Sequence, residues 1–423
     1  MKSASNFACL VLALLTACGR DDGRGMPQPE RALSAPAKEN DLRRAVLREA
    51  ALRAGFVRAD TLEVETDPRK RAIGALIFAS PLMSLNSRIS CQDCHRDEFG
   101  SADGLPNAVG AGGSGHGAAR LNGSEGKILP RNALPFWGRG SKGFHTFFWD
   151  GRVRLEGKHV VSQFGESPPS SDPFLTAVHL PSVEVREMIV DTPGVRRAYV
   201  KEETKTANTI HQEIAQRFAL DAAIGPGLAS AYERQPKDIR FIDVADALAQ
   251  FIRHRFRIQS TPLERFVFDN GPIREAELAG GILFYGRGRC VQCHNGPYFS
   301  DLAFHAVAFP QAGFGKNGFG IDEGRFNTTL DPADRFLFRT PPLFNVAKTA
   351  PYSHSGSVGK LEEAIIAHFD PLRFAAPKAM TLRERADFFQ RLGAAANETL
   401  PSALSDKEVS EITAFLQMLS FEP

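Results

Sequence analysis

The sequence predicts a mainly α-helical protein with long loops, in which two similar units follow one another along a chain of 423 residues. Apolar residues recur at helical spacing in several segments, whereas no strand-rich segment of any length appears. The pattern Cys-x-x-Cys-His occurs twice, at 91–95 and at 290–294, and a short apolar helix is expected before each copy. Residues 96–130 are rich in glycine and poor in apolar side chains, which indicates loop rather than core.

The expected helices are placed by their apolar spacing. A helix over 41–54 precedes a shorter apolar one over 71–78, and the stretch 207–257 is helical as well. A helix over 278–285 leads to the second motif in the same way as 71–78 leads to the first. The chain closes with a helix that a capping box announces, with Ser405 and Glu408 three residues apart and an apolar stripe behind them, Val409, Ile412, Phe415, Leu416 and Leu419.

Cys-x-x-Cys-His is the spacing of covalent c-type haem attachment. The two sulfurs bond to the two vinyl groups of one haem, and the adjacent histidine binds the iron as its proximal ligand. The predicted attachment residues are Cys91, Cys94 and His95 for one haem and Cys290, Cys293 and His294 for the other. A zinc site or a redox dithiol also uses paired cysteines, but neither requires histidine at the next position.

Composition narrows the class of protein. A hydrophobic content of 43% is sufficient for packed cores, and a formal net charge of +2 argues against a dedicated nucleic-acid partner. The six cysteines are accounted for by the two motifs and by Cys9 and Cys18, so no pair is left for a structural disulfide in the mature chain.

The first residues indicate export. Residues 1–17 carry a short apolar run, too short for a stable membrane span, and the sequence Leu-Thr-Ala-Cys-Gly around Cys18 resembles the lipobox of bacterial lipoproteins. Cys18 would then carry a lipid, with 18–40 as a flexible tether, and Gly19 resembles outer-membrane sorting on the periplasmic side. An ordinary cleavable signal near Ala17 is the alternative.

Several ordered segments resemble the bacterial di-haem cytochrome c peroxidase family, which includes the MauG branch. They are RNALPFW and FFWDGR after the first haem motif, CVQCHNGPYFSDLAFH at the second, and FRTPPLFNVAKTAPYSHSG near the end. The resemblance implies two cytochrome c-like domains with haem-wrapping loops, a peroxidatic N-terminal one over 41–270 and an electron-transfer one over 271–423. It also implies that hydrogen peroxide is reduced with electrons relayed from the C-terminal to the N-terminal haem.

Two competing functions remain open. MauG-like proteins use peroxide to oxidise a protein or peptide partner, and a di-haem chain without a reactive site would only carry electrons. The partner is accordingly a small redox protein as electron donor, or a protein or peptide substrate, and a homodimer is possible by analogy with the peroxidases.

The resemblance also implies iron ligands. His368 stands where the peroxidases carry methionine and the MauG branch carries tyrosine, so it is the expected sixth ligand of the C-terminal haem, with His354 as the alternative. A second imidazole lowers the reduction potential relative to methionine. Gly115-His116-Gly117 looks like the loop whose histidine reversibly caps the N-terminal haem in the peroxidases.

The remaining site residues are also carried over from the family. Glu156 is the expected acid/base group for peroxide, with His145 as a substitute, whereas Phe147 occupies the position of the family's glutamine. Trp137 is the expected bridge for electrons between the haems, and Arg339 the expected partner of a haem propionate. A calcium ion between the domains would be held by Asn132, Thr349 and Pro351, which supply oxygen ligands.

Overall fold

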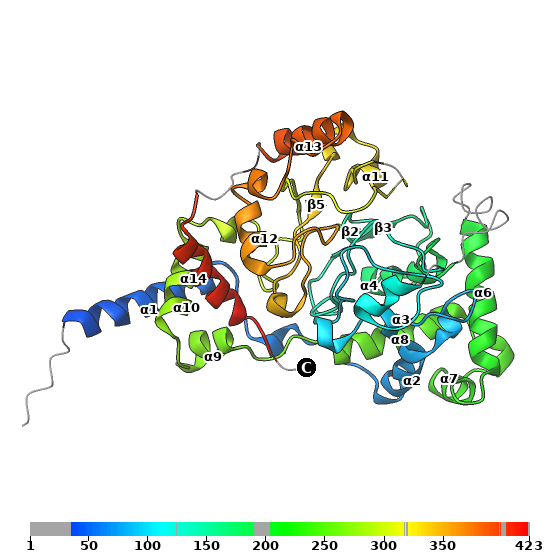
Figure 1. Cartoon of the computed structure of the whole chain (residues 1–423). Helices are drawn as coiled ribbons and strands as arrows, with labels where there is room; N and C mark the ends of the chain where they lie inside the picture. Colours follow the sequence, from blue (N-terminus) through cyan, green and yellow to red (C-terminus); the bar gives the residue numbers. More distant parts are fainter. Residues whose placement is uncertain are drawn as a thin grey trace, which may run out of the picture. The chain divides into compact units, whose positions relative to one another are not determined.

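The computed structural model describes residues 35–123, 125–189, 204–316, 318, 320–396, 398 and 403–421 (Figure 1). The predicted signal segment, Cys18 and most of the predicted tether lie outside the described residues. Residues 43–423 form one compact unit, and the residues before Arg43 form a separate one. In the described part of the chain, no helix combines the length and the apolar character needed to cross a membrane.

The first helix, α1, spans Ala35–Arg53 and begins earlier than predicted, so residues 35–40 are helical rather than part of a tether. Pro36 causes no break there, because the first N–H groups of a helix have no partner within the helix. The residues after it are good helix formers. In the second half of α1, Leu47 is fully buried and its methyl groups lie against Gly281.

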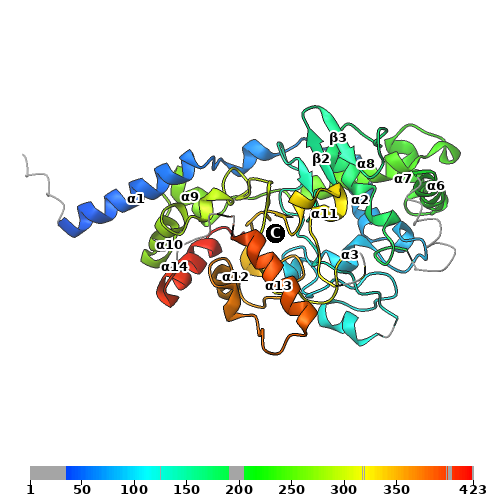
Figure 2. The ribbon, with the colours of Figure 1, turned by 90° about the horizontal axis from the view of Figure 1, so that it is seen from above.

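Two helix pairs organise the compact unit. Helix α2 (Pro68–Ala79) packs on α8 (Phe241–Arg255), and α10 (Glu275–Tyr285) packs on α14 (Asp406–Gln417), as both ribbon views show (Figures 1 and 2). Each crossing occurs at a glycine without space for a side chain. A Cβ on Gly74 would overlap the carbonyl oxygen of Ala247, and a Cβ on Gly280 would overlap that of Glu411. The first helix of each pair precedes one haem motif, which makes the internal repeat visible in three dimensions.

The other helices connect these pairs. The predicted helical stretch 207–257 is divided by Pro226 and Pro236, which mark the start of α7 and of the short turn before α8. The predicted segment after Leu361 is a helix, and the capping box at Ser405 is present. The remaining α-helices are α3 (Cys91–Cys94), α4 (Pro173–Val178), α6 (Thr204–Leu220), α7 (Gly225–Ala231), α9 (Pro262–Asp269), α11 (Phe326–Thr329), α12 (Leu361–Ala367) and α13 (Leu382–Ala395).

Two small antiparallel sheets were not predicted. One joins β1 (Thr146–Phe147), β2 (Val153–Glu156) and β3 (His159–Ser162), and the other joins β4 (Phe304–His305) and β5 (Phe338–Arg339). Glu156 pairs with His159, so β2 and β3 are connected by a two-residue turn in which Gly157 has φ +60°. Glycine tolerates that left-handed conformation without steric cost. Because these strands are so short, the sequence contains too little alternation of apolar and polar residues to predict them.

A single large apolar core includes residues of both helix pairs. Phe78 of α2 and Val244 of α8 belong to it, as do Phe284 of α10 and Phe415 of α14. The long loops also contribute buried apolar residues, among them Trp137, Phe299 and Phe344. The described chain therefore has the predicted mainly α architecture.

Candidate functional site

The second motif presents a histidine that is prepared to bind a metal. The His294 Nδ1–H donates to the carbonyl oxygen of Phe299 at 2.9 Å, which leaves the Nε2 lone pair available. Burial lowers the pKa of His294 to about 4, so the ring is neutral at physiological pH. A neutral imidazole oriented through its other nitrogen is the form that ligates iron.

His368 faces His294. It follows directly after α12, and its Nδ1–H donates to the carbonyl oxygen of Ala364 at 2.7 Å. The two ring centres lie 6.4 Å apart. A metal–imidazole bond of about 2 Å, with roughly 1.2 Å more from the nitrogen to the centre of each ring, gives a separation of about 6.4 Å when one metal lies between two imidazoles. Burial also lowers the pKa of His368. The separation therefore fits one iron held between the two rings.

A cavity of about 440 Å³ contains these two histidines and Cys290 and Cys293. Its volume is within the range of roughly 300–1,000 Å³ that is usual for cofactor pockets. Apolar side chains from α12 and α14 form much of its wall, among them Leu361, Ile365, Ile412 and Leu416. A flat, largely apolar macrocycle fits such a lining.

Two buried arginines form no ion pair within the part of the chain that the structure describes, which indicates an anionic group of a cofactor beside them. Arg339 lines the cavity and is fully buried, and its Nη2 has no hydrogen-bond partner among the described residues. Burial lowers the pKa of Arg339 to about 10. Arg139 is likewise buried, with Nε and Nη2 unpartnered, and burial together with the charge of Arg339 lowers its pKa. A buried guanidinium without an anion is unfavourable, and haem propionates would supply that anion.

The first motif is arranged like the second. The His95 Nδ1–H donates to the carbonyl oxygen of Ser101 at 2.8 Å, and its ring stacks on Phe136 with centres 3.8 Å apart. Burial lowers the pKa of His95 to about 4. Ser90 and Asp93 cap the short helix that carries the two cysteines. Both predicted proximal histidines are thus neutral and oriented through Nδ1.

Two carboxyl groups with a raised pKa act on the first motif, Asp103, whose pKa burial raises to about 6, and Glu187, and neither was predicted from the sequence. Burial raises the pKa of Glu187 to about 7, and the neighbouring Glu184 adds to this rise. Its charge acts on both cysteines of the motif, since it contributes, after burial, to the raised pKa of Cys91 and of Cys94. A carboxyl group that titrates near neutral pH is suited to acid/base catalysis. The signal in the sequence is a single acidic residue beside the apolar pair Met188-Ile189.

The predicted acid/base residue, Glu156, lies in a different environment. It ends β2, its side chain is 55% exposed, and its carboxylate pairs with the Arg154 guanidinium at 2.6 Å. Glu187 is therefore a second candidate for this role, and the assignment of Glu156 stays a prediction. His145 is also exposed, and Phe147 is buried in the core.

His116 is exposed at the start of a short helical turn. Its neighbour Gly117 lies against the ring of Phe99, which follows His95 closely in the chain. Arg120 holds this loop by donating to the carbonyl oxygens of Val109, Gly110 and Gly115. The loop is therefore next to the first motif, while the His116 side chain faces solvent, and a capping role stays a prediction.

The two tryptophans occupy different places. The Trp137 indole donates to the carbonyl oxygen of Gly100 at 2.9 Å and meets the ring of Phe421 with centres 4.9 Å apart, so it links the first haem loop to the C-terminal segment. Trp149 lines the cavity of the second motif, and its indole donates to the carbonyl oxygen of Asn132 at 3.1 Å. Trp149 is thus the tryptophan in the wall of that cavity.

The three predicted calcium ligands converge. The Asn132 amide lies 2.6 Å from the carbonyl oxygen of Pro351, and all three residues, Asn132, Thr349 and Pro351, line the same cavity. The oxygen and nitrogen of an asparagine amide are assigned from their contacts rather than observed. The contact is a hydrogen bond from the Asn132 amide to the Pro351 carbonyl oxygen, and because these residue types also offer oxygen ligands of the kind calcium prefers, a calcium ion at this place stays a prediction.

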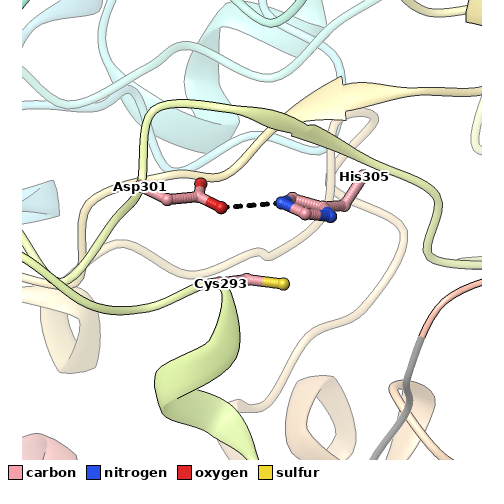
Figure 3. A group of neighbouring side chains, drawn as sticks. All are labelled: Cys293, Asp301 and His305. Carbon is pink, nitrogen blue, oxygen red and sulfur yellow. Dashed lines mark hydrogen bonds and ion pairs between the residues drawn. The ribbon is translucent and has the colours of Figure 1, made fainter. Parts of the chain in front are cut away.

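The remaining histidines of the cavity have other partners. His354 stacks on Phe338, and its Nε2 lies 3.0 Å from the Gln311 side-chain oxygen. His305 lies beside Cys293 with Asp301, a group that could hold a metal ion (Figure 3). Because Cys293 belongs to the second Cys-x-x-Cys-His motif, His305 and Asp301 lie in the immediate surroundings of that motif.

Fold and site together define a protein with two haem centres, and comparison with known proteins identifies its family. Residues 68–270 match the family model of the di-haem cytochrome c peroxidases. The methylamine utilization protein MauG of Methylorubrum extorquens is 26% identical over 400 residues, which cover 92% of this chain and 88% of that protein. The cytochrome c551 peroxidase of Pseudomonas aeruginosa is 26% identical over 300 residues, 70% of each chain.

Solved structures share the fold. The di-haem peroxidase BthA from Burkholderia thailandensis matches with a TM-score of 0.62 and 18% identity, covering 86% of this chain and 89% of that one. A MauG-like protein associated with microbial copper homeostasis matches with a TM-score of 0.60 and 22% identity, covering 85% and 92%. The chain belongs to the di-haem cytochrome c peroxidase family, with relatives in both its peroxidase and its MauG branches.

Proposed function

We propose that this protein reduces hydrogen peroxide with electrons taken from a small redox protein. The observation that carries this function is the pair of Cys-x-x-Cys-His motifs, each with a half-buried, neutral histidine, together with a carboxyl group of raised pKa beside the first one. The family supports an oxidoreductase that acts on peroxide.

The two haems, when bound, supply the redox chemistry: the C-terminal one accepts electrons and the N-terminal one is where peroxide is reduced. We propose covalent attachment through Cys91 and Cys94 and through Cys290 and Cys293, because both pairs have the attachment spacing. His95 and His294 are the proximal ligands in this proposal, and His368 is the second ligand of the C-terminal iron.

Glu187 moves the proton in this proposal. Its carboxylate oxygen accepts the proton from one oxygen of hydrogen peroxide and returns it to the other oxygen, which leaves as water. Reduction of one peroxide to two water molecules then takes up two electrons and two protons. Arg139 and Arg339 would hold propionates, because each is a buried guanidinium without an acidic partner.

Electrons would travel between the two halves along aromatic residues. Trp149 lies in the wall of the C-terminal cavity and Trp137 beside the N-terminal haem loop, so we include both in the relay. We further propose a calcium ion at Asn132, Thr349 and Pro351, and export with a lipid on Cys18, whose surroundings resemble a lipobox.

A specific observation favours the MauG-like alternative, in which peroxide drives oxidation of a protein or peptide. The opposed rings of His294 and His368 fit bis-imidazole iron, which has a lower reduction potential than the methionine-ligated centre of the ordinary peroxidases. Such a centre is a weaker acceptor for electrons from a high-potential cytochrome.

Stopped-flow absorbance of residues 19–423, with hydrogen peroxide added to the oxidised and to the half-reduced protein, separates these functions. A fast reaction of the half-reduced form, with turnover of a reduced cytochrome c, is expected for the peroxidase. A fast reaction of the fully oxidised form would favour the MauG-like function. If neither form reacts, the protein is an electron carrier and both enzymatic proposals fail.

A further inference from the structure

His305 is held beside the second haem motif. The Asp301 backbone N–H donates to the carbonyl oxygen of Cys293 at 2.8 Å, so the loop after the motif folds back onto it. The side-chain atoms of Cys293, Asp301 and His305 that could bind a metal lie within 4.8 Å of one another (Figure 3). His305 and Glu398 also line the cavity of this motif. His305 is therefore a close neighbour of a sulfur to which the proposed haem is bonded.

Both ring nitrogens of His305 carry a proton. Nε2 lies 2.7 Å from the Asp301 carboxylate and Nδ1 lies 3.1 Å from the Glu398 carboxylate. Because a carboxylate only accepts hydrogen bonds, each nitrogen has to donate, and the ring is a positively charged imidazolium. The other oxygen of Asp301 accepts from the N–H of Ala303 at 2.9 Å, and that of Glu398 from the N–H of Ala306 at 3.1 Å. These bonds fix both carboxylates, and with them the ring.

The charges of this group are only partly screened by solvent. The exposed fraction of the side chain is 25% for His305, 19% for Asp301 and 26% for Glu398. One cation and two carboxylates give a net charge of −1. Without the positive charge of His305 the group would carry −2, and without one carboxylate it would be neutral. A negative charge opposes the addition of an electron nearby, and a positive charge favours it.

We propose that His305 is a positioning residue for electron transfer, whose positive charge beside Cys293 favours the reduced state of the C-terminal haem. In that step the small redox protein is oxidised by one electron and the haem iron is reduced from ferric to ferrous. No covalent bond forms or breaks, and His305 keeps both protons. This inference rests on the proposed attachment of a haem to Cys290 and Cys293, and it deepens the proposed function.

Spectroelectrochemical titration of the haem-loaded protein at pH 7 tests the proposal. The midpoint potential of the C-terminal haem should fall in His305→Gln, which removes a positive charge. It should rise in Glu398→Gln, which removes a negative one. A unit charge about 10 Å away, at an effective dielectric constant of about 20, changes an equilibrium constant by roughly tenfold. We therefore expect shifts of about tenfold in opposite directions, which is about 59 mV for a one-electron reduction.

The opposite signs separate a charge effect from a loosened site, since loosening would move the midpoint in the same direction in both variants. His305→Lys keeps a positive charge and should keep the midpoint near that of the unmodified protein. His159→Gln, the same exchange at the exposed start of β3, is the matched control, and the N-terminal haem is the internal one. An unshifted midpoint in His305→Gln, or shifts of one sign in His305→Gln and Glu398→Gln, overturns the proposal.

The potentials are measured without peroxide, so the result is independent of the proposed function. Opposite shifts in a protein that does not react with peroxide would reject the enzymatic function and keep the role of His305 in electron transfer. Peroxide turnover with unshifted potentials would keep the function and reject the role of His305. Spectra that show a haem only at the first motif would also reject that role.

Discussion

Glu187 is the residue on which peroxide chemistry is expected to depend most. Replacing it with glutamine keeps the shape of the side chain and removes its ability to accept a proton. Loss of a positioned general acid/base typically costs about 10²–10⁴-fold in rate, so we expect a loss of that order in Glu187→Gln. Single-turnover stopped-flow measurement of the peroxide reaction tests this expected loss of rate.

Glu156→Gln is the matched control for this experiment. Glu156 is exposed and pairs with Arg154, and surface ion pairs contribute little to stability. Its replacement is expected to leave the rate within about twofold, because the exchange touches no group near the haem motifs. A large loss in Glu156→Gln with none in Glu187→Gln would restore the assignment made from the sequence.

His368 is expected to set the reduction potential of the C-terminal haem. Methionine favours ferrous iron relative to imidazole, so His368→Met should raise that potential. Axial ligands span about 0.8 V, and we expect a shift on the order of 0.1–0.3 V. Spectroelectrochemical titration measures both haems at once, and the N-terminal haem serves as the internal control. Equal potentials in the two proteins would show that His368 does not bind iron.

At the level of single residues, the sequence was informative where chemistry is local. The Cys-x-x-Cys-His motifs can be recognised in the sequence because their five residues are consecutive. Glu187 acts on Cys91 only because the loop that carries it folds back across the first haem motif, and no spacing in the sequence encodes that approach. For the same reason, Trp149 could not be assigned to the C-terminal cavity from FFWDGR alone.

The glycine crossings of the helix pairs are expected to be intolerant of any side chain. In Gly280→Ala, the new Cβ would overlap the carbonyl oxygen of Glu411, and overpacking of this kind typically costs about 1–3 kcal/mol of unfolding free energy. Gly393 in α13 has open space around it, so Gly393→Ala should be neutral or stabilise by about 0.5–1 kcal/mol. Thermal denaturation of both variants compares the two sites. A loss in Gly393→Ala equal to that in Gly280→Ala would mean that the crossing is not tight.

The His305 side chain connects β4 to the segment before α14 through ion pairs. Its Nε2 lies 2.7 Å from Asp301 and its Nδ1 lies 3.1 Å from Glu398, so both nitrogens donate and the ring is charged. The hydrogen bond to Asp301, together with the one to Glu398, raises the pKa of His305 above the ordinary value for histidine. This stabilisation is full below pH 6.5, the ordinary pKa of histidine, and is lost as the pH rises through the raised pKa of the folded protein.

The thermal midpoint of His305→Gln should therefore lie below that of the unmodified protein by more at pH 6 than at pH 9. Thermal denaturation at the two pH values, followed by circular dichroism, tests this difference. Lys158→Met is a suitable control, since it removes a charge at the exposed turn between β2 and β3. A difference that grows with pH would mean that His305 is neutral in the folded protein.

Helices whose apolar residues recur at a regular spacing were predicted. The short strands, whose positions depend on tertiary contacts, were not. The helix after Ser405 has both a capping box and an apolar stripe, and it forms as expected. The hairpin of β2 and β3 is short, and its strands are held by register with β1 rather than by a long alternating pattern. The early start of α1 was missed because residues 18–40 were interpreted as a flexible tether, although Pro36 falls in the first turn of the helix, where proline is tolerated.

For the molecule as a whole, each half supplies residues to the site of the other. Lys316 of the C-terminal half forms an ion pair with Asp150 of the N-terminal half. Asn132 and Trp149 of the N-terminal half line the cavity of the second haem motif. The division at residue 270 between two haem units stays a prediction, and residues 43–423 form one compact unit. Reaction at one haem is therefore expected to depend on the integrity of both halves.

Calcium is expected to stabilise this arrangement, because Asn132 lies in the N-terminal half and Thr349 and Pro351 in the C-terminal half. A ligand that binds only the folded state at 100 times its Kd adds about 2.7 kcal/mol. The thermal midpoint of residues 19–423 should rise when calcium is added after chelation, and Asn132→Ala should abolish the rise. Asn107→Ala, which removes the bond to Ala312, should lower the baseline and keep the rise. A rise that persists in Asn132→Ala would place the calcium elsewhere, and its absence from the unmodified protein would remove the calcium site.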